Sequence, residues 1–431
     1  MKIRVMIKEM DYLIIYEHAS RELESVCLLK CELEQRGYTV KICYADDLWR
    51  KFYRPKVVIV PYIYSDEEVR EFSFFGKYRA NKIINLQWEQ IFCMNDEKKG
   101  FQKPSGSAKD CVFLAWGEGN KRFLENCGVV PEKIKVTGSI STDFCSTRFH
   151  RLNRGRGYLA EHYHIPADKK WMLFISSFSL TTDYVYRTVE ETVGCYRDLQ
   201  EFRDMQLKSQ RKILRWFSRI LDRDKEILII YRPHPAELKN KLLDEMQRRY
   251  KNFRCLMDLS VREWIDSSDY IYTWYSTSIV DAFFLNKYCG IIRPYAIDEE
   301  QELSIMKGAD VIRSFEELTY SMGSSDFPIE EKVIDRYYGN WHDGQAYKRI
   351  ADVCVDVLND DHYAMEGKIS PPDRQSIKYL VLRVMKQLCS YVRISRMFCG
   401  KKKRIFQNTE NNRYKSGEKI KNYSELIKES I

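Results

Sequence analysis

Short apolar runs alternate with amphipathic stretches over the first half of the chain. The apolar runs predict strands at residues 3–7, 38–43, 57–60, 82–86, 111–115 and 134–136. Residues 21–36 carry apolar positions at helical spacing, and Gly37 follows them as a helix stop. Strands this apolar, separated by helices, are typical of a parallel sheet that is covered on both faces. The pattern therefore predicts an α/β domain over residues 1–150.

The same alternation restarts after a polar stretch at residues 149–157, which is interpreted as a linker. Strands are predicted at 171–175, 227–231, 253–256, 270–272 and 290–292, with helices around 196–220, 238–250 and 278–285. This indicates a second doubly wound unit, over residues 151–345. The predicted fold class is α/β, with two Rossmann-like parallel-sheet domains facing a cleft and a helical extension at the C-terminal end.

The extension is predicted over residues 346–400. Ser370-Pro371-Pro372-Asp373 has the order of a helix start, with a capping serine, an early proline and an acid in the first turn. The helix behind it carries an apolar stripe, with basic residues off the stripe. The stripe consists of Ile377, Leu380, Val381, Val384, Leu388, Tyr391 and Val392. Two interpretations stay open: a helix packed on the body, or a helix that lies on a membrane surface.

Residues 401–431 form a basic tail that is expected to be disordered. It holds nine basic and four acidic residues, which is more than half of the net charge of +9. Together with the preceding helix, the segment 371–404 is expected to contact anionic lipid. The rest of the chain is nearly balanced in charge, which argues against nucleic-acid binding.

The composition narrows the class of protein further. A chain of 431 residues exceeds one ordinary core, and 44% hydrophobic residues is normal for a globular protein. The 13 cysteines are scattered without a Cys-x-x-Cys pair, which favours buried thiols in a reducing compartment. No leader segment and no membrane-spanning run is evident. We therefore expect a cytoplasmic protein, with the inner face of the plasma membrane as a second location.

A phosphate-binding turn is predicted at Tyr231-Arg232-Pro233-His234-Pro235, directly after an apolar strand. The prolines stiffen the turn, because each fixes φ and lacks an N–H. Ligands bind at the carboxyl ends of strands in such sheets, and a cation with an imidazole suits a phosphate. Arg232 and His234 are the candidate ligands.

The turn Ser276-Thr277-Ser278 precedes a predicted helix and offers hydroxyls beside free backbone N–H groups. It suits an anion; the alternative is an ordinary helix cap. With the His234 turn on an adjacent strand, it predicts a diphosphate or nucleotide site. Asp281, one turn further, is either an acceptor for a ribose hydroxyl or a solvated helix carboxylate. There is no Gly-x-Gly-x-x-Gly, Walker loop or metal-ligand cluster, so no cofactor and no metal are expected.

A general base is expected at a strand end of the first domain. Glu89 follows the strand at 82–86, and Glu118 follows the strand at 111–115, with a flexible glycine on each side. A carboxylate at either position can take a proton from an acceptor hydroxyl, although each can also be an ordinary surface acid. Glu17 and His18 are weaker candidates.

The order of these features resembles the GT-B glycosyltransferases of bacterial surface polysaccharide synthesis, over about residues 1–300. In the capsular Kdo transferases and polysialyltransferases, a His-Pro motif and a Ser/Thr motif bind the nucleotide of a CMP-sugar. His234-Pro235 and Ser276-Thr277-Ser278 match them. The CDP-glycerol glycerophosphotransferases are similar and have a Trp-His-Gly motif, where this chain has Trp88-Glu89-Gln90. The Gly-x-x-x-x-Asp turn that ends the first domain in these families is matched by residues 138–143.

The resemblance implies transfer of a sugar from a CMP- or UDP-type donor to a surface polysaccharide or lipid-linked glycan. The reaction would need no metal and would invert the anomeric carbon. Arg232, His234 and the turn 276–278 would contact the donor phosphates, and Glu89 or Glu118 would act as base. The alternatives are a CDP-polyol phosphotransferase of teichoic-acid type, a UDP-sugar 2-epimerase and a sugar-binding scaffold without catalysis.

Overall fold

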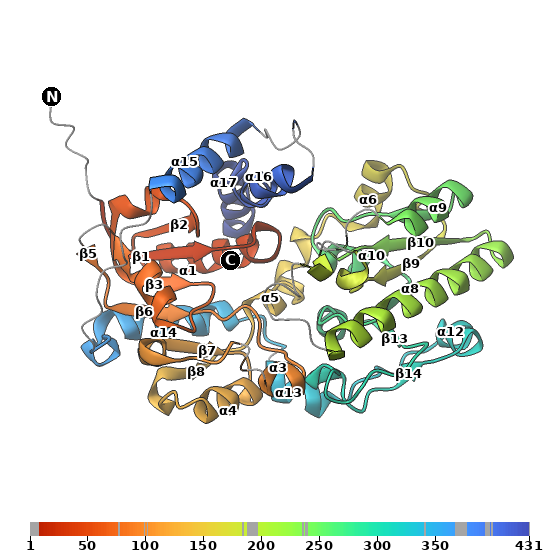
Figure 1. The fold of residues 1–431 in the computed structure, drawn as a ribbon, viewed down its shortest axis with the longest axis horizontal. Helices are drawn as coiled ribbons and strands as arrows, with labels where there is room; N and C mark the ends of the chain where they lie inside the picture. Colours follow the sequence, from red (N-terminus) through yellow and green to blue (C-terminus); the bar gives the residue numbers. More distant parts are fainter. Residues whose placement is uncertain are drawn as a thin grey trace. The chain divides into compact units, whose positions relative to one another are not determined.

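The computed structural model describes residues 8–75, 78–98, 100, 102–182, 185–187, 197–234, 237, 240–339, 342–366, 377–392, 397 and 400–430. The chain forms two compact units, each built on its own six-stranded sheet (Figure 1). Unit 1 contains Met1–Gln90, Gly100–Leu152 and Asp335–Ile431, and unit 2 contains Ile91–Lys99 and Asn153–Ile334. The end of the chain therefore returns to the first unit, and a short segment after Gln90 belongs to the second.

The sheet of unit 1 is parallel throughout, in the order β2-β1-β3-β6-β7-β8. Its strands are β1 (Lys8–Tyr16), β2 (Val40–Tyr44), β3 (Tyr53–Val60), β6 (Lys82–Asn85), β7 (Val112–Ala115) and β8 (Ile134–Val136). The strand predicted at residues 3–7 lies outside the described residues, and the first described strand extends to Tyr16 instead. The chain adds β2 on one side of β1 and then β3 on the other side, so the topological switch point lies between β1 and β3.

Helices cover both faces of this sheet because the side chains of β1 alternate between two apolar clusters. Tyr12 and Ile14 pack with α1 (Ala19–Gln35), α5 (Ile140–Asp143) and α14 (Ala346–Asn359). Leu13 and Ile15 pack with α2 (Asp66–Ser73) and α4 (Glu118–Asn126) on the opposite face. A two-stranded hairpin of β4 (Phe74–Phe75) and β5 (Tyr78–Arg79) follows α2.

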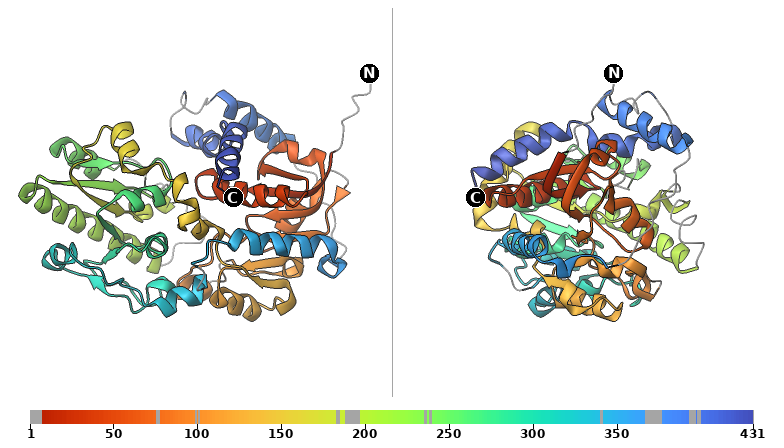
Figure 2. Two further views of the ribbon diagram at one scale, coloured as in Figure 1. Left: turned by 180° about the vertical axis from the view of Figure 1, so that it is seen from behind. Right: turned by 90° about the vertical axis from the view of Figure 1, so that its left-hand side faces the viewer.

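The tail is helical, and the expectation of disorder is wrong for the residues that the structure describes. After α15 (Ile377–Val392) come α16 (Gly400–Arg413) and α17 (Ser416–Lys428), and α17 lies beside α1 (Figure 2). Ile420, Tyr423 and Ile427 are spaced three and four residues apart, so they share one helix face and pack against the core of unit 1. The predicted helix start at residues 370–373 lies outside the described residues.

The sheet of unit 2 is also parallel, in the order β11-β10-β9-β12-β13-β14. Its strands are β9 (Lys170–Ile175), β10 (Ile227–Arg232), β11 (Phe253–Cys255), β12 (Tyr270–Thr273), β13 (Gly290–Ile292) and β14 (Val311–Ile312). In order of appearance this is 3-2-1-4-5-6, the Rossmann order, and its switch point lies between β9 and β12. Within this sheet, β14 is the one described strand that has no counterpart among the predicted strands.

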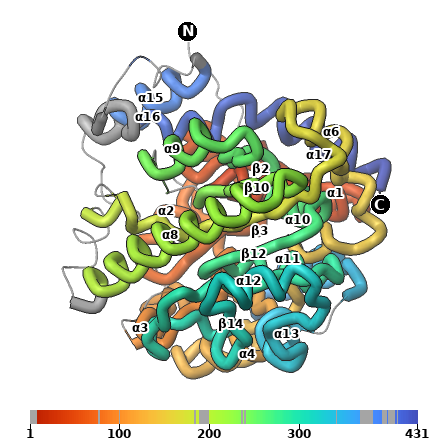
Figure 3. The backbone as a smooth tube through the Cα atoms, turned by 90° about the vertical axis from the view of Figure 1, so that its right-hand side faces the viewer, coloured from red at the N-terminus to blue at the C-terminus, as the bar shows by residue number. Residues whose placement is uncertain are grey.

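Helices also cover both faces of this sheet (Figure 3). On one face, α8 (Arg197–Arg223), α9 (Lys241–Arg249) and α12 (Phe315–Ser321) contribute to a single apolar cluster. On the other face, Trp264 of α10 (Val261–Ser267) packs against Trp171 of β9. The helix α11 (Ile279–Phe284) lies against α10. The helix α3 (Met94–Lys98) belongs to unit 2, and α13 (Glu331–Tyr338) carries the chain back to unit 1.

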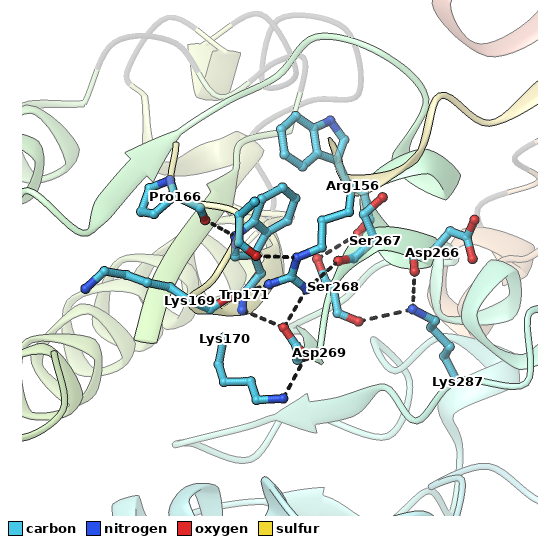
Figure 4. Close-up of polar contacts among 12 residues, drawn as sticks. Arg156, Pro166, Lys169, Lys170, Trp171, Asp266, Ser267, Ser268, Asp269 and Lys287 are labelled. Atoms are coloured by element: carbon cyan, nitrogen blue, oxygen red, sulfur yellow. Dashed lines mark hydrogen bonds and ion pairs between the residues drawn. The ribbon is translucent and has the colours of Figure 1, made fainter. Parts of the chain in front are cut away.

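The stretch predicted as a linker is ordered. Residues 155–157 begin α6 (Gly155–Tyr163), and Arg156 is tied to the amino ends of β9 and β12 (Figure 4). Its guanidinium donates hydrogen bonds to the Asp269 carboxylate (2.8 Å) and to three backbone carbonyls. It also lies over the ring of Trp171, 4.4 Å from the centroid. The arginine's multiple donors therefore fix this segment to the body of unit 2.

The start of α14 is held by Asp143, the last residue of the Gly-x-x-x-x-Asp turn. The buried carboxylate accepts hydrogen bonds from the N–H groups of Ala346 (2.9 Å) and Tyr347 (2.7 Å). Burial raises the pKa of the Asp143 carboxyl to about 7, although the two N–H groups oppose this shift. The carboxyl thus joins two segments of unit 1 that are about 200 residues apart.

Replacing Asp143 by alanine should lower the free energy of unfolding by about 2 kcal/mol, because two buried N–H groups lose their acceptor. Urea denaturation measures this loss. Asp143→Asn, which keeps an acceptor, is the control and should lose less.

Since the folded pKa of Asp143 is raised from 3.8 to about 7, the stability that the bound proton contributes is present at low pH. It is lost as the pH rises through about 7. The free energy of unfolding of the wild type, relative to that of Asp143→Asn, should therefore fall as the pH rises from 3.8 to about 7. A constant difference would show that the folded protein holds no proton on Asp143 in this range.

Candidate functional site

The carboxyl edge of the unit 2 sheet brings together three strand ends. Arg232 of β10 and Thr273 of β12 both pair with Ile175 of β9. The two predicted turns therefore do not follow adjacent strands, as the sequence interpretation supposed, because β9 lies between them. Neighbouring strands are about 4.8 Å apart, so the two strand ends are about 10 Å apart. The residues after β9 fill this gap, next to the switch point where ligands bind in such sheets.

Two serines follow β9 and were not identified from the sequence. The backbone N–H of Ser176 donates to the carbonyl of Arg232 (2.9 Å), which continues the sheet by one residue. Ser177 is buried, and its hydroxyl has no hydrogen-bond partner within the described structure. A buried hydroxyl usually has a partner, so this one is suited to a ligand that approaches the strand end.

The His234 turn is anchored by Glu237, a further residue that the sequence interpretation missed. The buried Glu237 carboxylate accepts hydrogen bonds from Ser176 Oγ (2.5 Å), Tyr231 Oη (2.7 Å) and Gln210 Nε2 (2.7 Å). It also accepts one from the backbone N–H of His234 (3.3 Å), and Glu237 N–H donates to the carbonyl of His234 (2.7 Å). Burial raises the pKa of Glu237. The carboxylate therefore holds the turn against β9 and β10.

The predicted phosphate ligands have different settings. His234 is exposed at the carboxyl edge of the sheet. Arg232 is half-buried, and its guanidinium donates to the carbonyls of Asp258 (2.8 Å) and Leu259 (2.5 Å). Burial lowers the pKa of Arg232 to about 10, while the charges of Asp258 and Glu263 oppose the shift. Arg232 thus remains charged but holds a neighbouring loop.

The turn Ser276-Thr277-Ser278 lies at the start of α11, as the sequence predicts. Thr277 is exposed, and Ser278 N–H donates to Ser276 Oγ (3.2 Å). Ser278 makes no side-chain capping bond to α11, so the ordinary helix-cap alternative does not describe its hydroxyl.

Asp281 of α11 is in an internal environment rather than on a solvated helix surface. It is half-buried, and burial raises the pKa of its carboxyl to about 6, opposed by the charge of Arg262. Arg262 is buried on α10 and also donates to Asn153 Oδ1 (3.0 Å). The structure therefore places Asp281 beside a buried cation of its own unit.

In unit 1, Glu89 lies in a cluster of charged residues at the carboxyl ends of β1 and β6. Its carboxylate accepts from Arg21 Nη1 (2.5 Å) and Gln102 Nε2 (2.9 Å), and its side chain is about half exposed. Arg21 also pairs with the buried Glu22 (3.1 Å). Both oxygens of Glu89 are therefore engaged.

Glu17 and His18 belong to the same cluster, directly after β1 at the switch point of unit 1. The His18 ring nitrogen lies 3.6 Å from the Glu17 carboxylate. Burial raises the pKa of Glu17, opposed by Arg21, and burial together with Arg21 lowers the pKa of His18. Shifted titrations that gather at one strand edge are typical of functional sites. We call Glu17, His18, Arg21, Glu22 and Glu89 the acid cluster.

Glu118 is placed apart from the acid cluster. It is the first residue of α4, is about half exposed, and lies 3.5 Å from Lys121. It lines an open hollow of about 600 Å³ beside β8, together with Lys135 and Arg349. The glycines on its two sides do not serve flexibility, because a Cβ on Gly117 would lie 2.7 Å from the carbonyl oxygen of Arg336. They allow close packing instead.

The loop that carries Glu89 is shaped by a buried amide network. Gln87 adopts a left-handed backbone with φ of 46°, which is uncommon for a residue other than glycine. Gln90 donates to the carbonyls of Gln87 (3.0 Å) and Leu114 (2.8 Å) and accepts from Trp116 N–H (2.7 Å). Strained backbone held by such a network often occurs at functional sites. In the part of the chain that the structure describes, no group of three His, Cys, Asp or Glu could hold a metal ion.

Comparisons with known proteins identify the fold. No protein-family model matches the chain, and no curated protein matches it. A UDP-GlcNAc 2-epimerase from Methanocaldococcus jannaschii, in complex with UDP-GlcNAc and UDP, matches with a TM-score of 0.52 at 13% identity, over 80% of this chain and 100% of that one. The S. aureus MnaA–UDP structure matches at 0.51 and 15%, over 82% and 97%. The wall teichoic acid polymerase TagF with CDPG matches at 0.53 and 12%, over 83% and 91%. The chain has a GT-B-like α/β fold of two Rossmann-like domains.

Glu237→Gln should lower the free energy of unfolding by about 2 kcal/mol, because a buried acceptor of several donors is replaced by an amide that brings its own donors. Urea denaturation followed by tryptophan fluorescence measures the change. Glu245→Gln, at an exposed position of α9, is the matched control and should stay within about 0.5 kcal/mol of the wild type. If both variants were equally stable, Glu237 would not anchor the turn.

Proposed function

We propose that this protein is a transferase that uses a nucleotide-activated sugar as donor. The observation that supports the proposal most is the switch-point edge of unit 2, where Ser177, His234 and the turn 276–278 follow strand ends around β9. Solved structures that this chain resembles contain UDP, UDP-GlcNAc or CDPG. A CMP- or UDP-type donor is therefore the expected ligand.

In the proposed reaction, unit 2 holds the nucleotide. The unpartnered Ser177 hydroxyl and the hydroxyls of the turn 276–278 donate hydrogen bonds to the phosphates. The His234 imidazole also donates a hydrogen bond to the phosphates. Arg232 does not contact them in this proposal, but its positive charge at the end of β10 attracts them. Such donors stabilise negative charge as the nucleotide leaves, so the proposal requires no metal for this step.

A carboxylate of unit 1 takes the proton of the acceptor hydroxyl in this proposal. Glu89 remains a candidate, because each of its oxygens keeps acceptor capacity beside the single hydrogen bond from Arg21 or Gln102. Glu17 is a further candidate, because burial raises the pKa of its carboxyl, which lies 3.6 Å from the His18 ring. Glu118 is the third candidate. Direct displacement by the activated hydroxyl would invert the anomeric carbon, and the acceptor would be a surface polysaccharide or a lipid-linked glycan.

Two other reactions share the fold: transfer of a polyol phosphate from a CDP-polyol, and 2-epimerisation of a UDP-sugar. The structural matches to TagF and to the epimerases are of similar quality, so they favour neither. Incubation with CMP-, UDP- and CDP-linked donors separates the three reactions. An epimerase converts its UDP-sugar without an acceptor, whereas a polyol phosphotransferase releases CMP from a CDP-polyol. If the protein catalysed epimerisation or polyol phosphate transfer, and transferred no sugar from any donor, the proposed sugar transfer would be wrong.

His234→Ala and Ser177→Ala should weaken nucleotide binding without destabilising the fold. We expect a loss of about three- to tenfold in affinity for Ser177→Ala, as for one hydrogen bond. We expect a loss of about 100-fold in turnover for His234→Ala, as for one donor to developing charge. Calorimetric titration with CMP, CDP, UDP and GDP measures binding and also identifies the base of the donor.

Each variant has a matched control. Ser73 of α2, in unit 1, also has a buried hydroxyl without a partner in the described structure, so Ser73→Ala should bind nucleotide normally. His362→Ala, at an exposed position, is the control for His234→Ala and should leave nucleotide binding and turnover normal. Equal effects in a variant and its control would contradict the assigned site.

The three candidate bases are separated by Glu17→Gln, Glu89→Gln and Glu118→Gln. Loss of the base should lower kcat by about 100-fold or more and leave nucleotide affinity unchanged, because the base contacts the acceptor rather than the donor. We expect this pattern for Glu17→Gln or Glu89→Gln and near-normal turnover for Glu118→Gln. If Glu118→Gln alone were inactive, the acid cluster would not supply the base.

A further inference from the structure

The helix α15 turns its polar residues toward the body of unit 1. Arg383, Gln387 and Ser390 recur at spacings of three and four residues and are buried. The Arg383 guanidinium lies 3.6 Å from both Asp46 and Glu71. Gln387 accepts from Leu48 N–H (3.0 Å) and donates to Asp47 (3.1 Å). Charged and hydrogen-bonding groups therefore hold this face of the helix.

Arg413 of α16 strengthens the same attachment. Its guanidinium donates to Ser390 Oγ (3.1 Å) and to the Tyr391 hydroxyl (2.6 Å), and it lies 3.8 Å from the Asp47 carboxylate. An arginine with several partners at a buried site fixes the rotation of the helix that it contacts. The rotation of α15 about its own axis is thus set by specific polar contacts.

Apart from Tyr391, whose hydroxyl accepts a hydrogen bond from Arg413, the apolar stripe of α15 faces away from these contacts. Val381, Val384, Met385, Leu388 and Tyr391 follow one another at helical spacing and are between 39% and 57% exposed, except Leu388 at 62%. A helix on a globular protein normally buries such a stripe, and a contiguous exposed one marks an interaction surface. We call these five residues the α15 stripe; the helix lies at the β2 side of unit 1, beside η1 (Leu48–Phe52) (Figure 1).

The charge of the surrounding sequence favours an anionic partner. Residues 374–409 contain ten basic residues and no acidic residue, which exceeds the net charge of +9 of the whole chain. A second copy of the chain would place an equally basic segment against this one across a twofold interface, and the like charges would repel. A basic segment that carries an apolar stripe matches the surface of an anionic bilayer, where the stripe enters the interface and the charges attract lipid headgroups.

We propose that the α15 stripe lies in the interface of an anionic lipid membrane, which makes this protein a peripheral membrane protein. Among the described helices, none is long and apolar enough to cross a membrane. This inference does not depend on the proposed reaction.

Co-sedimentation of the full-length protein with vesicles tests the inference. The vesicles consist of phosphatidylcholine alone or of phosphatidylcholine with phosphatidylglycerol. The wild type should bind the vesicles that contain phosphatidylglycerol, and added salt should weaken binding. Met385→Gln combined with Leu388→Gln should weaken binding by about tenfold or more, because the buried apolar area is lost. These side chains are exposed, so thermal unfolding should be unchanged.

Tyr320→Gln is the matched control, because Tyr320 of α12 is 86% exposed but lies outside the basic segment. It should bind vesicles like the wild type. Absence of binding by the wild type would overturn the inference, as would equal binding by the stripe variant. A wild-type dimer that the stripe variant converts to a monomer, without vesicle binding by either, would show that the stripe joins two copies instead.

Discussion

Parallel pairing of every strand in the two six-stranded sheets is the constraint on which the rest of the structure depends. Parallel strands need crossover connections, so helices cover both faces and all carboxyl ends meet at one edge of each sheet. In unit 2 this edge collects Ser177, His234 and the turn 276–278 around the switch point. In unit 1 it collects the acid cluster after β1 and β6. Residues that are far apart in the sequence become neighbours because the strands share one direction.

Much of the fold could be predicted from the sequence, because apolar runs and helical spacing are local signals. The order of strands is not local, and the two phosphate-type turns were therefore taken to be adjacent when β9 lies between them. Ser177 was missed for this reason. Glu237 had a usable signal, since an acid three residues after His234 can return to the backbone of its own turn. The first strand was placed at residues 3–7, whereas β1 ends at Tyr16, directly before Glu17.

The C-terminal helices show a different limit. The apolar stripe of α15 was evident from periodicity, but periodicity alone does not say which face of a helix meets the body. The orientation of α15 depends on acidic partners in the body of unit 1. Arg383 lies beside Asp46 and Glu71, and Asp47 is the partner of both Gln387 and Arg413. These buried polar groups would otherwise lack partners. For the final tail, its net charge suggested disorder, while the spacing of Ile420, Tyr423 and Ile427 was the signal that mattered.

A crystal structure of the full-length protein with UDP or CDP would show where the phosphates bind. We expect them over the carboxyl ends of β9 and β12, within hydrogen-bond distance of Ser177 Oγ and the turn 276–278. A nucleotide bound at the carboxyl edge of the unit 1 sheet would contradict the proposed binding site. So would a nucleotide in unit 2 that leaves Ser177 and the turn without a contact.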